Sequence, residues 1–162
     1  MGESTSRSTR NEAAEILQRG LDLLDPVMRA HNFSYAEGPS GRSSGGYFAS
    51  GAYSRDDRKL EIHYRYGVGL ITYHVGASSL RHEVFMRALL GPEGGNRFPG
   101  FSVEPMDAFR DLQYDLQTYT GDFLSGSGEM FRTCVESARA ARKLSGIERA
   151  EQRWPNSTGE TP

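Results

Sequence analysis

Three histidines are the residues of this sequence best suited to acid-base or metal chemistry. They are His63, His74 and His82, and an imidazole both transfers protons near neutral pH and binds metal ions. His63 and His74 fall in two adjacent predicted strands, where Glu61 is placed to orient His74. Glu61, His63, His74 and His82 are therefore the candidate catalytic set of a small hydrolase or metal-dependent enzyme. The alternative is a polar sheet surface that carries a cross-strand pair between Glu61 and His74.

Three carboxylates form a second candidate group, because Asp107, Asp111 and Asp115 recur every four residues. Residues at this spacing share one face of a helix, so the pattern predicts an acidic ridge opposite the apolar stripe of the same helix. Like charges at this spacing repel one another, which suggests a positively charged group nearby. We expect the ridge to be hydrated, to contact a protein partner or, as a third alternative, to bind a cation.

Two glycine-rich segments, residues 38–46 and 91–101, each carry one arginine, Arg42 and Arg97. Backbone N–H groups beside a guanidinium can hold an anion. Neither segment matches the glycine patterns of the P-loop or of dinucleotide-binding folds. The sequence therefore favours connecting loops, with anion binding by Arg42 and Arg97 as the alternative.

The segment 59–76 is the element that must position the histidines, and its alternation of apolar and polar residues predicts a β-hairpin. The predicted apolar face of the first strand comprises Leu60, Ile62, Tyr64 and Tyr66. A turn at Gly67 and Val68 pairs Ile62 with Tyr73, Tyr64 with Ile71, and Leu60 with Val75. The opposite face then holds Glu61, His63, Arg65, Thr72 and His74. This polar face is the expected binding surface.

The strand before the hairpin, residues 47–54, is rich in small side chains. Ala49, Gly51 and Ala52 leave room above the sheet, so that a helix or a ligand can approach closely. Gly51 alternatively marks a β-bulge. The tyrosines of the predicted sheet, by contrast, favour core packing over nucleic-acid stacking, because Tyr64 and Tyr73 fall on the apolar face.

The remaining elements follow from helical periodicity and from glycine and proline breaks. A first helix ends near Ala30 and is expected to kink or restart at Pro26, a short strand covers 33–36, and three helices follow Gly76. A serine, Ser78 or Ser79, is expected to cap the first of these three. The prediction is an α+β two-layer sandwich, with an antiparallel sheet of three to four strands packed against about four helices in the order α-β-β-β-β-α-α-α. Residues 9–150 form one predicted domain between disordered tails at 1–8 and 151–162.

Composition narrows the function further. The chain has 162 residues, a formal net charge of -2 and one cysteine, so neither a disulfide nor an overall attraction to nucleic acid or anionic lipid is expected. The sequence holds no apolar run of bilayer length and does not open with a secretory leader. We therefore expect a cytoplasmic protein that binds no membrane, nucleic acid, cofactor or metal.

These features favour a non-catalytic protein that binds another protein through the polar sheet face and the acidic ridge. The layout, a leading helix followed by β-hairpins, is similar to that of small bacterial immunity-type proteins. This resemblance covers most of the chain, rests on layout alone and implies a bacterial toxin-binding role without assigning residues. The expected partner surface comprises Glu61, His63, Arg65, His74, Arg42, Arg97, Asp107, Asp111 and Asp115.

Overall fold

A computed structural model describes residues 11–153 of the chain, with side chains through residue 150. The predicted tail at 1–8 lies outside this range, as do residues 154–162 of the tail predicted at 151–162, whereas residues 151–153 are helical and not disordered. The helices are α1 (Glu12–Ala30), α2 (His82–Leu90), α3 (Pro105–Tyr119), α4 (Gly121–Leu124) and α5 (Glu129–Arg153). The strands are β1 (Ser34–Glu37), β2 (Gly41–Ser43), β3 (Gly46–Arg55), β4 (Arg58–Tyr64), β5 (Val68–Val75) and β6 (Ser78–Arg81).

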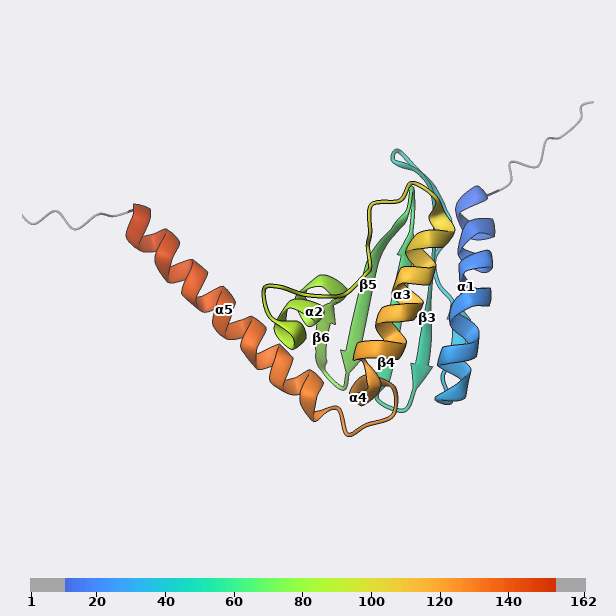
Figure 1. Cartoon of the computed structure of the whole chain (residues 1–162). Coiled ribbons are helices and arrows are strands. Elements are labelled where there is room, and N and C mark those ends of the chain that lie inside the picture. Colours follow the sequence, from blue (N-terminus) through green and yellow to red (C-terminus); the bar gives the residue numbers. More distant parts are fainter. Residues whose placement is uncertain (1–10, 154–162) are drawn as a thin grey trace, which may run out of the picture.

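The strands form an antiparallel sheet in the order β1-β3-β4-β5-β6, and β2 pairs with the beginning of β3. The helices α1 and α3 lie side by side against one face of this sheet (Figure 1), where α1 contacts β3 and α3 contacts β5. At the β6 end of the sheet, α2 packs against α5. The predicted α+β class with an antiparallel sheet is confirmed.

The described chain has more elements than the sequence pattern predicted. Two extra strands, β2 and β6, and the one-turn helix α4 raise the totals to six strands and five helices. The serines expected to cap a helix instead continue the sheet as β6, because Ser78 and Ser79 pair with Val75 and His74. The helix begins only at His82, and the residue before it supplies no side-chain cap.

The hairpin of β4 and β5 has the predicted faces but not the predicted partners. Ile62 pairs with Ile71 and Leu60 with Tyr73, a shift of two residues from the expected register, and beyond the irregularity after His63 Tyr64 pairs with Val68. The turn is longer than expected and runs from Arg65 to Gly67, with an irregularity in the pairing at Tyr64. A shift of two leaves every side chain on its original face, so the alternation could not distinguish the two registers. Tyr66 lies in this turn and is 80% exposed, not on the apolar face.

Helix α1 continues through Pro26 as one helix, without the predicted restart. Asp25, the residue before this proline, accepts a hydrogen bond from the Tyr53 hydroxyl of β3. Burial raises the pKa of Tyr53, and the bond to Asp25 raises it further. Asn32 follows the helix in the left-handed conformation, with φ of 63°, as expected for a residue that ends a helix.

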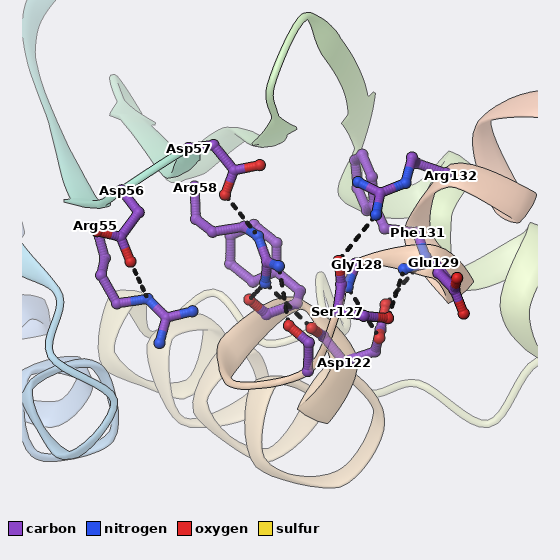
Figure 2. Close-up of polar contacts among 12 residues, drawn as sticks. Arg55, Asp56, Asp57, Arg58, Asp122, Ser127, Gly128, Glu129, Phe131 and Arg132 are labelled. Atoms are coloured by element: carbon purple, nitrogen blue, oxygen red, sulfur yellow. Dashed lines mark hydrogen bonds and ion pairs between the residues drawn. The ribbon is translucent and has the colours of Figure 1, made fainter.

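The buried guanidinium of Arg58 sets the path of the chain into α5. It donates to the carbonyl oxygens of Asp122, Phe123 and Gly126 at 3.1, 2.6 and 2.9 Å, as Figure 2 shows for the surrounding network. The Asp122 carboxylate in turn accepts from the backbone N–H groups of Gly128 and Phe131. This contact holds the first turn of α5, which then extends away from the sheet (Figure 1). The helix is described as far as Arg153, past the predicted domain end at residue 150.

Candidate functional site

The two faces of the sheet differ sharply in burial. The inner face, under α1 and α3, carries buried residues such as Leu60, Ile62 and Tyr73. On the outer face, the strand side chains from β1 to β6 are all half-buried or exposed. No helix buries this outer face within the described chain, so the polar side of the hairpin is accessible from solvent.

A trough of about 410 Å³ crosses the outer face. Its floor is built from small residues of neighbouring strands, Ala36 on β1 and Ser50 and Ala52 on β3. The larger side chains of β4 and β5 stand along one side, and the connection from β1 to β2 stands along the other. The lining residues are Ala36, Glu37, Gly38, Pro39, Ser50, Gly51, Ala52, Glu61, Ile62, His63, Leu70 and Thr72. We call this feature the outer trough.

Glu61 lines the outer trough and forms the predicted pair with His74, which lies beside the trough on the same sheet face. Glu61 faces Thr72 across the strands, yet its carboxylate reaches Nε2 of His74 diagonally at 3.0 Å. The Lys59 ammonium lies 2.7 Å from the same carboxylate. The hydrogen bond from Lys59 is the main cause that holds the pKa of Glu61 below its ordinary value, and the bond to His74 lowers it further. This contact orients His74, as the sequence suggested.

His63 also lines the outer trough but is engaged in packing. Its ring stacks on Phe48 with an interplanar angle of 8° and a centroid distance of 6.0 Å. Arg65, which was assigned to the same face, lies instead in the turn after β4. There its guanidinium donates to Oγ of Ser43 at 2.8 Å and lies over the Phe48 ring. Arg65 therefore joins two hairpin turns.

His82 does not join the other two histidines, so the four-residue catalytic set is not assembled. It lies on the inner side of the sheet with no exposed surface. Its Nδ1 contacts the Tyr73 hydroxyl at 2.9 Å, and its Nε2 contacts Oδ2 of Asp115 at 3.0 Å. Burial raises the pKa of the Tyr73 hydroxyl well above its ordinary value, and the nearby Asp115 carboxylate raises it further. These groups are closed off from any substrate.

Asp115 also breaks the predicted acidic ridge on α3. It is fully buried, and its carboxylate accepts from the backbone N–H groups of Arg97 and Phe98 at 2.7 and 2.9 Å. Asp107 is half-buried near the start of the helix, where Oγ of Ser102 donates to it and Arg110 pairs with it at 2.7 Å. Both contacts lower the pKa of Asp107, and the hydrogen bond from Ser102 lowers it more than the one from Arg110. The ridge thus reduces to Asp107 and Asp111.

The two loop arginines lie over aromatic rings in separate parts of the fold. Arg42 of β2 lies 5.4 Å from the centre of the Tyr47 ring. Arg97, in the segment between α2 and α3, lies 3.5 Å from the centre of the Tyr114 ring. Guanidinium groups placed in this way gain from cation–π attraction. Anion binding by either arginine stays a prediction.

Sequence reasoning missed Arg58 and the buried contacts of Asp115, because neither residue type indicates burial. The small floor of the outer trough did leave a signal in the sequence, since the room above Ala52 was predicted. Gly51, however, faces the inner side, where the Tyr35 ring fills the space that a side chain would need. Cys134 is buried, and burial raises the pKa of its thiol.

The chain was compared with protein-family models, with curated proteins and with solved structures, and none gave a significant match. Among the described residues, no group of three or more His, Cys, Asp and Glu side chains lies close enough to hold a metal ion. Of the helices described, none has both the length and the apolar character that crossing a membrane requires.

Proposed function

We propose that this protein is a non-catalytic binding module that holds a protein partner in the outer trough. The observation that carries the proposal is an open sheet face hollowed over small side chains, with a volume of about 410 Å³. A sheet packed by helices on one face only leaves the other face available for association. Its mixture of apolar floor and polar wall is typical of protein interfaces, which combine an apolar centre with a polar rim.

The groups around the trough suit a partner that offers both an apolar contact and polar groups that form hydrogen bonds. Leu70, 44% exposed, offers an apolar contact beside His63. Glu61 and His74 are already held in position by their hydrogen bond, so less side-chain entropy is lost when they contact a partner. A bacterial toxin, as the similarity in layout to immunity-type proteins implies, is one partner of this kind.

The proposal is tested by a substitution that fills the trough and leaves the buried core residues unchanged. The variant Ala52→Arg places a long charged side chain on the trough floor, and Ser54→Arg places the same side chain two residues along the same face of β3, outside the trough. Affinity capture from the source cells, with quantitative mass spectrometry, compares both variants with the unchanged protein. We expect a partner recovered with the unchanged protein and with Ser54→Arg but lost with Ala52→Arg. If no captured protein distinguishes Ala52→Arg from Ser54→Arg, the proposal is wrong.

A further inference from the structure

A second concave surface lies at the other end of the sheet, between β6, α2 and α5. It consists of two hollows of about 470 Å³ each, which share the residues Val84 and Arg142. The first hollow opens beside Thr72 on the outer face, and the second runs between α2 and α5. Because they share these two lining residues, the hollows are adjacent, and we call the two together the α2–α5 groove. Figure 1 shows α5 extending past α2 on this side.

Every charged residue that lines the α2–α5 groove is an arginine. These residues are Arg81, Arg87 and Arg142, and no carboxylate lines either hollow. Within the described part of the chain, none of the three guanidinium groups makes a hydrogen bond or an ion pair. A Glu83–Arg87 pair, expected from four-residue spacing, is not formed. The groove therefore presents three uncompensated positive charges, in a geometry that pairs with carboxylates.

The floor of the groove between these arginines is apolar and shallow. Val84 and Ala88 of α2 face Ala138 and Ala141 of α5 across it. Short side chains on both helices let a third helix approach closely, whereas a longer side chain would fill the space. A helix that fits must carry small or aliphatic residues along one face and acidic residues at its borders.

We propose that the α2–α5 groove binds an acidic amphipathic helix of another protein. Helix-in-groove recognition uses this combination of an apolar stripe and matching border charges. Nucleic acid is a weaker fit because phosphate-binding surfaces are polar and strongly basic throughout, whereas this floor is apolar. A second copy of this chain is a weaker fit too. The acidic helix that a second copy would offer is α1. The large exposed apolar residues of the described chain all lie outside α1, so this helix has no apolar stripe to place in the groove.

The test measures binding of a designed peptide to the full-length protein by fluorescence anisotropy. The probe is a labelled, end-capped peptide of about four helical turns, with leucine and alanine on one face and glutamate at both borders. A second peptide has lysine in place of each glutamate. We expect the acidic peptide to bind at least about tenfold more tightly than the lysine peptide, and to weaken as salt is raised.

Matched protein variants locate the binding. Arg142→Glu reverses a charge in the groove, and Arg139→Glu makes the same change on the same helix, outside the lining residues. We expect Arg142→Glu to weaken peptide binding by about tenfold or more, equivalent to ~1.4 kcal/mol, and Arg139→Glu to change it less than about twofold. Circular dichroism should show unchanged thermal unfolding for both variants, since both side chains are exposed.

Other outcomes overturn the proposal. Equal weakening by the two variants would show a diffuse charge effect and no groove. Arg142-dependent binding of duplex DNA or of vesicles of anionic lipid, without binding of the acidic peptide, would assign the surface to polyanions. A dimer seen by size exclusion and broken by Arg142→Glu would assign it to a second copy. The Ala52→Arg variant should leave peptide binding intact, which keeps this test independent of the outer trough.

Discussion

Burial changes what a carboxylate does, and Asp115 shows this most clearly. By spacing, it belongs with Asp107 and Asp111 on an acidic helix face. In the fold, it is enclosed and accepts hydrogen bonds from two backbone N–H groups and contacts His82. A buried carboxylate is tolerated only when its oxygen atoms are paired in this way. Asp115 therefore joins α3 to α2 and to the segment before α3.

The first prediction concerns the substitution Asp115→Ala. It leaves the N–H groups of Arg97 and Phe98 and the ring of His82 buried without their acceptor. We expect the free energy of unfolding to fall by about 3 kcal/mol or more, because each unpaired buried donor is costly. Urea denaturation measures this change.

The matched control is Asp111→Ala, one turn earlier on α3. Asp111 is half-buried and makes no hydrogen bond or ion pair among the described residues. Its loss should change stability by less than about 0.5 kcal/mol. Equal effects of the two substitutions would contradict the structural role assigned to Asp115.

At the scale of elements, one buried arginine fixes how α4 and α5 leave the sheet. Arg58 lies at the beginning of β4, where its strand neighbours on the same face enter the core. Its side chain is only 6% exposed, and its donors serve the carbonyl oxygens around the end of α4. The carbonyl groups of Asp122 and Phe123 belong to the last turn of α4, and that of Gly126 follows it, where carbonyls lack partners within the helix. Arg58 thus adds a long-range cap to the local hydrogen bonds that end α4.

The second prediction follows from this contact. Arg58→Ala removes the three hydrogen bonds to carbonyl oxygens and the one to the Asp57 carboxylate, and should lower the free energy of unfolding by about 3 kcal/mol. It should also increase amide exchange in the first turn of α5, measured by hydrogen–deuterium exchange. Arg58→Lys keeps the charge but not the planar arrangement of donors, so an intermediate loss is expected.

The matched control for Arg58→Ala is Arg29→Ala, which removes an arginine on the protein surface. Arg29 pairs with Asp25 at 3.3 Å, but its side chain is 72% exposed. Exposed pairs contribute little, so the loss should stay below about 1 kcal/mol. If Arg58→Ala leaves exchange in α5 unchanged, Arg58 does not hold the helix in place.

At the scale of the whole molecule, the fold divides into a packed body and a projecting helix. The first half of α5 buries Phe131, Cys134 and Val135 against the body. From Arg139 to Leu144 every residue is exposed, and Leu144 and Ile147 expose 62% and 53% of their surface. Helices without tertiary packing are only marginally stable. This projecting half therefore forms one side of the α2–α5 groove at a local cost in stability.

The third prediction tests that division in the isolated, full-length protein at low concentration. Amides of residues 139–150 should exchange faster than those of residues 131–138 by on the order of tenfold or more, since local opening there exposes no packed side chains. Hydrogen–deuterium exchange read by mass spectrometry or NMR measures the gradient. Uniform protection along α5 would mean that another surface already covers the helix. Addition of the acidic peptide should raise protection in this half.

The sequence by itself determined the features that repeat along the chain. Alternation placed Leu60, Ile62 and Tyr73 on the buried face and Glu61 and His74 on the open one, because side-chain direction in a strand is a local property. Helical periodicity located most of α1, α3 and α5 for the same reason. The pairing of Glu61 with His74 followed from the shared face, even though the predicted register was wrong by two residues.

Only the tertiary structure decided the features that depend on distant segments. The register between β4 and β5, the burial of Asp115 and the long-range cap by Arg58 each require contacts between residues far apart in the chain. The outer trough likewise exists because small residues of β1 and β3 become neighbours. The type of a residue and its local spacing indicate what chemistry its side chain can do. Whether that side chain is buried, and which groups it contacts, is decided only when the helices pack on the sheet.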